Sequence, residues 1–442
     1  MNRHKKTHSV FEYSKLHFEA PLSHSVAHNL NLKCEELKRH TKADVLLPLR
    51  NSHNQTIGVE ARQYVGVVEI NDHLSIQILP KMSAAEDKQT ACEQSVQNLL
   101  YMLNYCGKLL STQSSTSALK TFKGDFFEIL IYLYATTLMS ETRNNLHHEY
   151  ITEDQNMPYL RGKLLIKEHI LANAITRDKF YLRADEFTAD NALNQIFAFV
   201  TRQLLDSTSH HLNKRLLSEL SLMLSEVTPK TVHLQDAQRI HITRLNKRFA
   251  PALELAKLFL GGRSLTLKSD RFDSSTFLLD MNVLFEDFVT AILKKSIDSD
   301  LIVYSQGPRE HLVTSQRTGY TEEKRPAFML KPDISIAQRN RPSELLYIID
   351  TKYKILDEEQ SKFGISQADM YQMYAYANRY KTKHITLLYP LRNEQEIEEK
   401  TYLVEDECEI SIRTIDLRGD LKKTLPSIKS ELLTGLSLES LL

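Results

Sequence analysis

Two aspartate residues and a lysine form the clearest candidate for a functional site in this sequence. Pro332-Asp333 opens an alternating stretch, and Asp350-Thr351-Lys352 follows at the end of the apolar run LLYIID. The polar segment QRNRPSE between them favours a turn, so an antiparallel hairpin would bring Asp333 close to Asp350. Residues two apart on a strand share a face, and therefore Asp350 and Lys352 should point the same way.

Two carboxylates beside an ammonium group suit a hard cation. Mg²⁺ takes oxygen ligands, usually one or two carboxylates, with water and substrate phosphate completing the shell. We expect Asp333 and Asp350 to bind Mg²⁺, with the Thr351 side chain facing away and its carbonyl completing the shell. Lys352 would orient the attacking water or stabilise charge on the phosphate. An ion pair of Asp350 with Lys352 or Lys354 at a strand end explains the same triplet without catalysis.

Two predicted helices carry further polar groups that suit such a site. Glu286 follows the core residue Phe285 on a half-apolar helical stripe, which fits either an inward site residue or an exposed glutamate. Gln372 and Tyr376 lie four apart on a predicted helix, 367–380, and so share a face. That face either contacts the scissile strand of a nucleic acid or packs aromatic rings on a sheet.

The elements that must position these groups divide the chain into three predicted parts. Residues 1–85 form a small β-rich module with a self-contained set of strands. Residues 86–263 are mostly helical, and residues 264–442 form an α/β domain, which makes the chain α/β (α+β overall). The expected helices of the last two parts are 96–103, 126–142, 192–205, 212–224, 252–260, 281–292 and 367–380, and the expected C-terminal strands are 301–304, 332–337, 345–351 and 384–389.

Composition limits the class of protein. The 442 residues are 42% hydrophobic and 25% charged, as in ordinary soluble globular proteins, and no apolar run is long enough to span a membrane. Four cysteines lie far apart without a CxxC motif, which predicts reduced thiols in a cytoplasmic protein. Residues 271–442 hold 23 basic and 28 acidic residues, so DNA binding would depend on a local basic patch.

The series PD…DTK, with a preceding helical Glu286 and a following Gln372, resembles the PD-(D/E)xK nuclease superfamily. More specifically, the chain resembles the McrC family, the nuclease subunit of McrBC-type modification-dependent restriction systems, over most of its length. The landmarks of this resemblance are YVGVVEI…LSIQILPKM (64–82), NLLYMLNYCGKL (98–109), MPYLRGKLLIKEHI (157–170), DEFTADNALNQIF (185–197), FLLDMNVLFEDFV (277–289), KPDISI (331–336), YIIDTKYK (347–354) and ADMYQMYAYANRY (368–380).

The resemblance implies a metal-dependent DNA endonuclease of a restriction system that acts in antiviral defence. It implies that Asp333 and Asp350 bind Mg²⁺, that Lys352 is the catalytic lysine, and that Glu286 and Gln372 belong to the site. It also implies an McrB-like AAA+ GTPase hexamer as partner, on which residues 1–85 would dock. The substrate would be DNA with modified bases such as 5-methylcytosine, and nuclease domains would dimerise on that DNA. An autonomous nuclease, or a non-cleaving adaptor that regulates its partner's GTPase, are the alternatives.

The sequence agrees that a nucleotide-driven motor belongs to another chain. A phosphate-binding P-loop needs Gly-x4-Gly-Lys-Ser/Thr. Gly-Lys occurs at Gly107 and Gly162, but Met102 and Met157 stand where the first glycine is needed. We therefore expect this chain not to bind a nucleoside triphosphate by itself.

Overall fold

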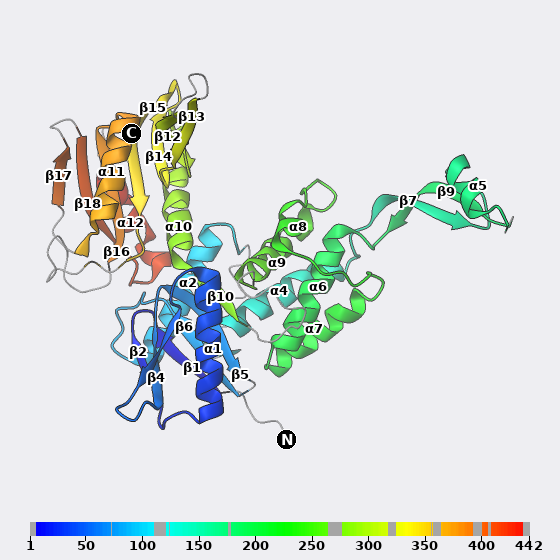
Figure 1. The fold of residues 1–442 in the computed structure, drawn as a ribbon, viewed down its shortest axis with the longest axis horizontal. Coiled ribbons are helices and arrows are strands. Elements are labelled where there is room, and N and C mark those ends of the chain that lie inside the picture. Colours follow the sequence, from blue (N-terminus) through cyan, green and yellow to red (C-terminus); the bar gives the residue numbers. More distant parts are fainter. Residues whose placement is uncertain are drawn as a thin grey trace. The chain divides into compact units, whose positions relative to one another are not determined.

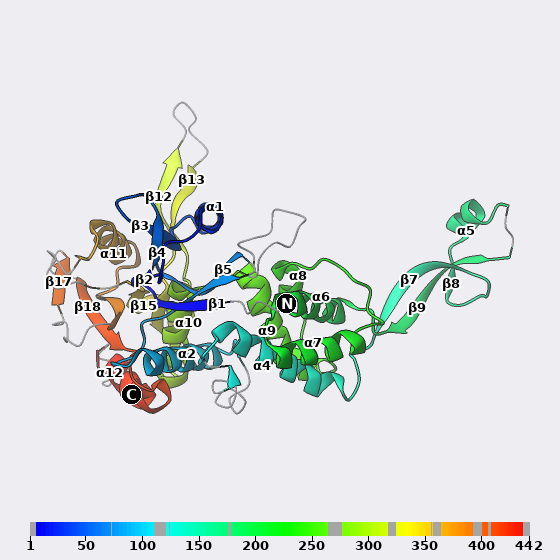
Figure 2. The same ribbon diagram turned by 90° about the horizontal axis from the view of Figure 1, so that it is seen from below.

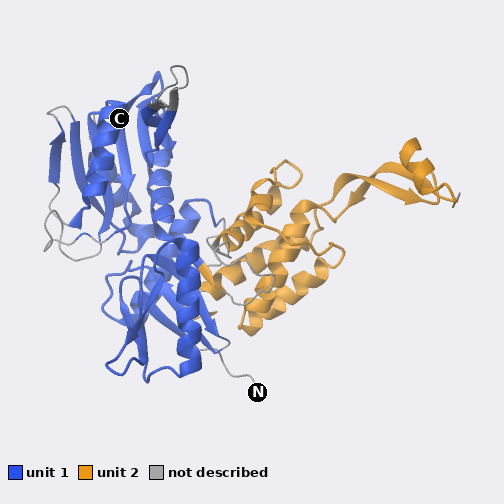
Figure 3. Cartoon of the chain, viewed as in Figure 1, with its two compact units in different colours: residues 1–109, 278–442 blue, residues 110–277 orange. Residues whose placement is uncertain are grey.

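The chain forms two compact units in the computed structural model (Figure 3). Unit 1 combines residues 1–109 with 278–442, and unit 2 spans 110–277. The predicted division at 85 and 263 into three domains stays a prediction, and residue 264 begins a segment outside the described residues. The structure describes residues 6–71, 73–109, 121–122, 124–175, 178–263, 276–316, 324–354, 356, 364–391, 400–404 and 408–435.

Two small sheets and a helix make up the N-terminal part of unit 1. The first sheet has the order β1-β6-β5-β10, with β1 parallel to β6 and β5 antiparallel to it. The second has the order β2-β4-β3. The elements are β1 (Lys6–Phe11), β2 (Lys15–His17), α1 (His24–Thr41), β3 (Leu46–Arg50), β4 (Thr56–Ala61), β5 (Tyr64–Asn71), β6 (Leu74–Leu79) and α2 (Lys88–Tyr105).

The expectation that the strands of residues 1–85 are self-contained is wrong. The fourth strand of the first sheet, β10 (Phe277–Asp280), comes from about 200 residues further along the chain and pairs beside β5. Its residues Phe277 and Leu278 are buried, and removing these apolar side chains from water favours the pairing. A four-residue strand without alternation carries no sequence signal for a distant partner, so the pattern alone could not reveal it.

A six-stranded mixed sheet forms the C-terminal part of unit 1 and confirms the α/β prediction. Its order is β11-β14-β15-β16-β18-β17, and β15, β16 and β18 are parallel to one another. The elements are α10 (Met281–Ser296), β11 (Leu301–Ser305), β12 (Glu310–Gln316), β13 (Lys324–Leu330), β14 (Ile334–Gln338), β15 (Arg341–Thr351), α11 (Gln367–Tyr380), β16 (His384–Leu391), β17 (Lys400–Val404), β18 (Cys408–Asp416) and α12 (Leu421–Gly435).

Helices cover both faces of this sheet, with α11 on one side and α10 and α12 on the other (Figure 2). Helix α11 is the crossover between the parallel strands β15 and β16, and Ser366 caps its N-terminus through the backbone N–H of Asp369. Buried Met373 and Tyr376 of α11 join one apolar cluster with sheet residues such as Ile348. This packing fixes the face of α11 that looks toward the end of β15.

The hairpin of β12 and β13 was not predicted. It is a separate two-stranded antiparallel sheet that projects beyond the six-stranded sheet (Figure 2). Phe328 and Met329 are 75% and 54% exposed, so this hairpin contributes little to the core. Tyr380 of α11 holds its base by donating a hydrogen bond to the carbonyl of Leu330.

Asn98 of α2 connects the N-terminal and C-terminal parts of unit 1. Its buried amide nitrogen lies 3.0 Å from the carbonyl oxygen of Met82, 3.2 Å from that of Leu417 and 2.7 Å from that of Gly419. Its side-chain oxygen accepts a hydrogen bond from the backbone N–H of Leu421 at the start of α12. One buried amide therefore satisfies backbone groups from both ends of the chain.

Unit 2 is a helical body with a β-stranded arm (Figure 1). The helical prediction is confirmed for the body, although its last helix continues through Gly261 and Gly262 to Arg263, beyond the expected end at residue 260. The elements are α4 (Phe126–Thr142), β7 (Glu149–Met157), β8 (Lys163–Leu164), α5 (Ile166–Ala172), β9 (Phe180–Thr188), α6 (Ala192–Ser207), α7 (His211–Met223), α8 (Leu234–Gln238), η1 (Lys247–Phe249) and α9 (Ala250–Arg263).

Glu128 of α4 organises the packing of this helical body. Its buried carboxylate accepts hydrogen bonds from the Thr208 hydroxyl at 2.6 Å, the Ser209 N–H at 2.8 Å and the Asn213 amide at 2.7 Å. These donors belong to the turn before α7 and to α7 itself, so the carboxylate caps that helix from a neighbouring one.

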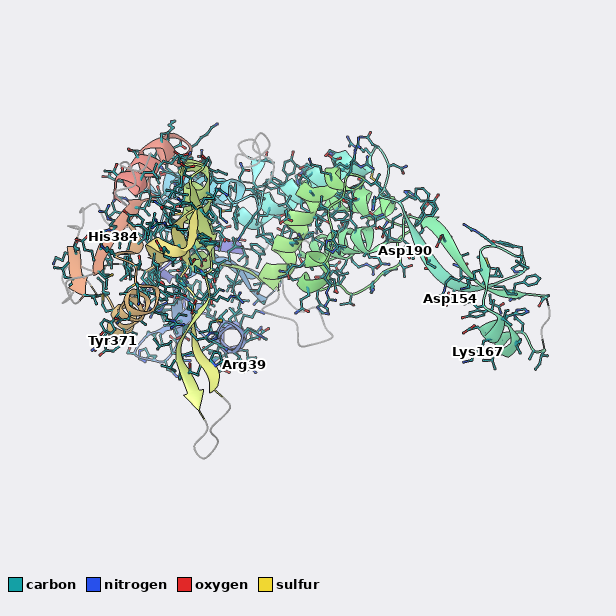
Figure 4. All side chains as sticks on the ribbon, turned by 90° about the horizontal axis from the view of Figure 1, so that it is seen from above. Arg39, Asp154, Lys167, Asp190, Tyr371 and His384 are labelled. Carbon is teal, nitrogen blue, oxygen red and sulfur yellow. The ribbon has the colours of Figure 1, made fainter. Side chains whose placement is uncertain are left out.

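The arm of unit 2 consists of β7, β8 and β9 with the short helix α5 between β8 and β9. Asp154 lies on the long ribbon of β7 and β9, and Lys167 lies in α5 (Figure 4). Most of the nine residues of β7 are exposed, and backbone pairing with β9 rather than core burial holds the strand. The polar sequence EYITEDQNM has no apolar alternation, which is why the sequence did not predict it.

Two further predictions are tested by the described residues. All four cysteines are free thiols, as expected. Within the ranges that the structure covers, no helix has the length and apolar character needed to cross a bilayer.

Candidate active site

The predicted hairpin forms and gathers the predicted residues. β14 and β15 are antiparallel, with Ile334 opposite Ile349, so Asp333 and Asp350 flank this pair at the same end of the sheet. The turn is tighter than expected, because β14 ends at Gln338 and β15 already begins at Arg341. Asp350 ends up at the carboxyl end of a parallel strand, where α/β sheets commonly place functional groups.

Asp350 is the buried centre of the site. It is 0% exposed, and its Oδ2 lies 2.5 Å from Nζ of Lys352. Burial and the nearby carboxylate of Asp333 raise the pKa of Asp350 in spite of the ammonium group. Burial by itself lowers the pKa of Lys352, but the carboxylates of Asp350 and Asp333 outweigh it and raise that pKa. The lysine is thus held as a cation beside two carboxylates.

Thr351 contacts Asp333, contrary to the expectation that its side chain faces away. The Thr351 N–H donates to Asp333 Oδ2 at 2.9 Å, and the hydroxyl lies 3.2 Å from the same oxygen. The hairpin therefore orients the Asp333 carboxylate through β15 itself. The prediction missed this contact because Thr351 sits where the strand ends and strict alternation of side chains no longer applies.

Gln372 joins the carboxylate, the lysine and a tyrosine. Its amide nitrogen lies 3.3 Å from Asp350 Oδ1 and 2.8 Å from the Tyr376 hydroxyl, and its oxygen accepts a hydrogen bond from Lys352 at 3.4 Å. Tyr376 in turn donates to the carbonyl of Lys331 at 3.1 Å, two residues before Asp333. The predicted face of α11 thus contacts the segment before β14 and the last residues of β15. Two other tyrosines of α11, Tyr371 (labelled in Figure 4) and Tyr374, are exposed.

Glu286 of α10 faces the same region through a residue that the sequence did not reveal. Its carboxylate is hydrogen-bonded to the side chain of Gln306, and the Gln306 N–H donates to the backbone oxygen of Asp333 at 2.7 Å. Burial, with a further contribution from Asp333, raises the pKa of Glu286 to about 7. Gln306 follows β11 in a turn with no motif around it, so only the fold could identify it.

The donor set fits a hard divalent cation. Among the residues that the structure describes, no three His, Cys, Asp or Glu side chains surround one point. Two neighbouring carboxylates, Asp333 and Asp350, are nevertheless the number that protein-bound Mg²⁺ ordinarily uses, with water and phosphate as the other ligands. Burial, with a smaller contribution from the carboxylate of Asp333, raises the pKa values of Asp350 and Glu286, and a bound cation would favour their ionised forms.

Solved structures of McrBC complexes contain chains that are similar to this one. A chain in the refined half-complex from a tetradecameric assembly of Thermococcus gammatolerans McrB AAA+ hexamers with bound McrC is similar over 97% of this chain and 99% of that chain. The identity is 23% and the TM-score 0.63, which shows a common fold. A chain of the Thermococcus gammatolerans McrBC complex covers 66% of this chain and 88% of its own length, with 27% identity and a TM-score of 0.49.

No curated protein matches this chain. The sequence model described as McrBC 5-methylcytosine restriction system component matches residues 59–390, which include the whole site and about three quarters of the sequence. The predicted resemblance is thereby confirmed, and the chain belongs to the family of McrBC 5-methylcytosine restriction system components.

Proposed function

We propose that this chain is the Mg²⁺-dependent DNA endonuclease subunit of a restriction system directed at 5-methylcytosine. The observation that carries the proposal is the buried Asp350 carboxylate in contact with both Lys352 and Gln372. A strand-end ion pair on a protein surface has no need of full burial, a second carboxylate and a bridging amide. Structural ion pairs are usually exposed, whereas perturbed pKa values cluster at functional sites.

Asp333 and Asp350 are the residues that would hold the metal ion, with the Thr351 carbonyl as a further ligand. A bound Mg²⁺ lowers the pKa of its water and offsets charge on the phosphate that is attacked. Thr351 keeps the Asp333 carboxylate oriented through two hydrogen bonds to one oxygen, Oδ2. The other carboxylate oxygen of Asp333 can therefore serve the ion.

Lys352 supplies positive charge where the phosphodiester gains negative charge. Its side chain is only 19% exposed, so water screens the charge weakly and its interaction with a phosphate is strong. Gln372 fixes the position of the ammonium group and of Asp350 together, and Tyr376 fixes Gln372. Glu286, with a pKa of about 7, is suited to exchange a proton near neutral pH.

A separate AAA+ GTPase hexamer of the McrB type is the partner in this proposal. The family, the bound McrB hexamers of the similar structure and the missing P-loop in this sequence support it. The partner would recognise the modified DNA and use GTP, and this chain would stimulate it. Cleavage of both strands then needs two nuclease domains on the DNA.

Two surfaces of the chain are candidates for the contact with that partner. The sequence assigned the contact to residues 1–85, and this stays a prediction. The tip of the arm of unit 2 is favoured by a different observation, namely that α5 has no buried residue. Monomeric proteins rarely leave contiguous apolar patches uncovered. The exposed apolar residues at this tip are Tyr159 (54%), Leu160 (63%), Ile166 (66%), Ile170 (62%), Leu171 (73%) and Ile175 (95%).

The two surfaces are separable by GTP turnover of the partner. We expect the double substitution Ile170→Ser and Leu171→Ser to abolish stimulation by the full-length chain, and the matched control Lys167→Ser on the same helix to preserve it. If the double variant stimulates GTP turnover as the wild type does, the contact is assigned to residues 1–85 instead.

The function itself is tested by incubating the purified chain and its AAA+ partner with methylated or unmethylated plasmid, Mg²⁺ and GTP. We expect cleavage only of methylated DNA and only with both proteins. Cleavage of either plasmid by the chain alone would favour an autonomous nuclease. Stimulated GTP turnover without any cleavage would favour a non-cleaving adaptor.

A further inference from the structure

A fully buried contact joins the N-terminal sheet to the residue that follows the site lysine. The Tyr353 hydroxyl donates a hydrogen bond to Glu12 Oε1 at 2.7 Å. Glu12 is 0% exposed and Tyr353 is 1% exposed. Glu12 directly follows β1, and its Oε1 also accepts the backbone N–H of Lys81, after β6, at 3.0 Å. The carboxylate is therefore held by the edge of the N-terminal sheet.

Tyr353 lies at the point where the chain leaves β15. The Lys352 N–H still donates to the carbonyl of Leu388 in β16 at 2.9 Å, and the Lys354 N–H donates to the Lys352 carbonyl at 2.9 Å. Beyond Thr351 the strand ladder ends, so these two bonds and the buried Tyr353 side chain hold the backbone of Lys352. The tyrosine is the only one of the three that reaches another sheet.

The tyrosine ring also touches the helix that carries Glu286. The ring centroids of Tyr353 and Phe285 are 5.8 Å apart with a 57° angle between the planes. Phe285 is 0% exposed and directly precedes Glu286 on α10. One phenol thus contacts the N-terminal sheet at its hydroxyl end and the site helix at its ring.

We propose that Glu12 is a positioning residue of the nuclease site, which acts through Tyr353 to fix Lys352 against Asp350. The N-terminal sheet is then a structural part of the site rather than only a docking module. This inference rests on the proposed function, because it assigns the role of Lys352 to phosphodiester cleavage. Lysine side chains are long and flexible, so a fixed backbone is needed to hold the 2.5 Å contact with Asp350.

A buried hydrogen bond, rather than apolar packing, is suited to this task. Packing tolerates shifts of a few tenths of an ångström, whereas a hydrogen bond to a carboxylate is short and directional. A misplacement of about 1 Å at a catalytic group can reduce the rate by about 10²-fold. Glu12 therefore influences the reaction without touching the substrate.

Three variants of the full-length chain test the inference. Tyr353→Phe removes the hydrogen bond and keeps the ring against Phe285, and Glu12→Gln keeps an acceptor oxygen for the Tyr353 hydroxyl. The matched control is Tyr134→Phe in unit 2, where a fully buried tyrosine donates to the carbonyl of Phe197 at 3.2 Å. All three are compared for thermal stability, for amide exchange with ¹⁵N-lysine labelling, and for cleavage in complex with the partner.

We expect Tyr353→Phe to increase amide exchange at Lys352 and Lys354 about tenfold or more. Its kcat should fall about 10- to 100-fold, with KM for DNA within about twofold. Glu12→Gln should remain close to wild type in both measurements. Tyr134→Phe should lower the melting temperature yet leave lysine exchange and kcat unchanged.

The opposite pattern would overturn the inference. If Tyr353→Phe only lowers the melting temperature, as the control does, Glu12 and Tyr353 merely stabilise unit 1. If the wild-type complex does not cleave DNA, the proposed function fails by itself. Lysine exchange in the free chain then still decides whether the N-terminal sheet fixes this backbone.

Discussion

Asp350→Asn separates metal binding from folding at the site. Asparagine has the size of aspartate and keeps one side-chain oxygen, which can accept from Lys352 or from Gln372, but it has no charge. Removing one partner of a buried ion pair costs about 3–5 kcal/mol. Here complete burial and, to a smaller extent, Asp333 already raise the pKa of Asp350, so the loss of its charge also removes a desolvation penalty and a repulsion. In the absence of divalent ions, we therefore expect the free energy of unfolding of Asp350→Asn to lie within about 2 kcal/mol of the wild-type value.

The increase in melting temperature that Mg²⁺ causes distinguishes this variant from the wild type. A ligand at ten times its dissociation constant stabilises a protein by about 1.4 kcal/mol. For a unit of this size that raises the melting temperature by about 2–3 °C. Wild-type protein should show this increase and Asp350→Asn should not.

Scanning calorimetry at pH 8, with and without MgCl₂, measures both quantities. The control is Asp154→Asn, the same substitution at an exposed ion pair with Arg183 in unit 2. This control should keep the full Mg²⁺-dependent increase. An equal increase in Asp350→Asn would show that the ion does not bind at Asp350.

Four further predictions concern other features of the chain. Stabilisation by Mg²⁺ should increase from pH 6 to pH 8, since Glu286 ionises near pH 7 and Asp350 above its usual range; a pH-independent effect would exclude these carboxylates. Without the ion, the contribution of Glu286 to stability should fall as pH rises from its ordinary pKa toward 7, because the folded chain retains a proton that the unfolded chain releases. The chain alone should bind unmodified DNA weakly and with strong salt dependence, because residues 271–442 carry 28 acidic and 23 basic residues; tight, salt-insensitive binding in a titration would contradict this. Asn98→Leu should destabilise unit 1 by about 2–4 kcal/mol in chemical denaturation, since it leaves the carbonyls of Met82 and Gly419 buried without their donor, whereas a change below about 0.5 kcal/mol would show that they find another.

The sequence predicted the parts of the site that lie close together in the chain. The hairpin of Asp333 and Asp350, the shared face of Asp350 and Lys352, and the helix of Gln372 depend on short-range periodicity, which the sequence displays directly. The bridging role of Gln372 also follows from its place on the predicted face.

Contacts between distant segments could not be predicted. The pairing of β10 with β5 and the bond of Tyr353 to Glu12 join residues separated by hundreds of positions, and no local pattern encodes them. The arm of unit 2 was missed for a different reason, since its exposed strands need no apolar alternation. Thr351 was placed wrongly because alternation fails at the last residue of a strand.

Single-turnover cleavage of methylated DNA by the complex with the partner measures the catalytic role of Lys352. Lys352→Met keeps an unbranched side chain of similar length and removes only the ammonium group that contacts Asp350. We predict that cleavage slows by about 10²-fold or more, while DNA binding and stimulation of GTP turnover stay at the wild-type level. Cleavage within about threefold of wild type would show that Lys352 does not stabilise the reacting phosphate, because removing such a residue causes a large loss of rate.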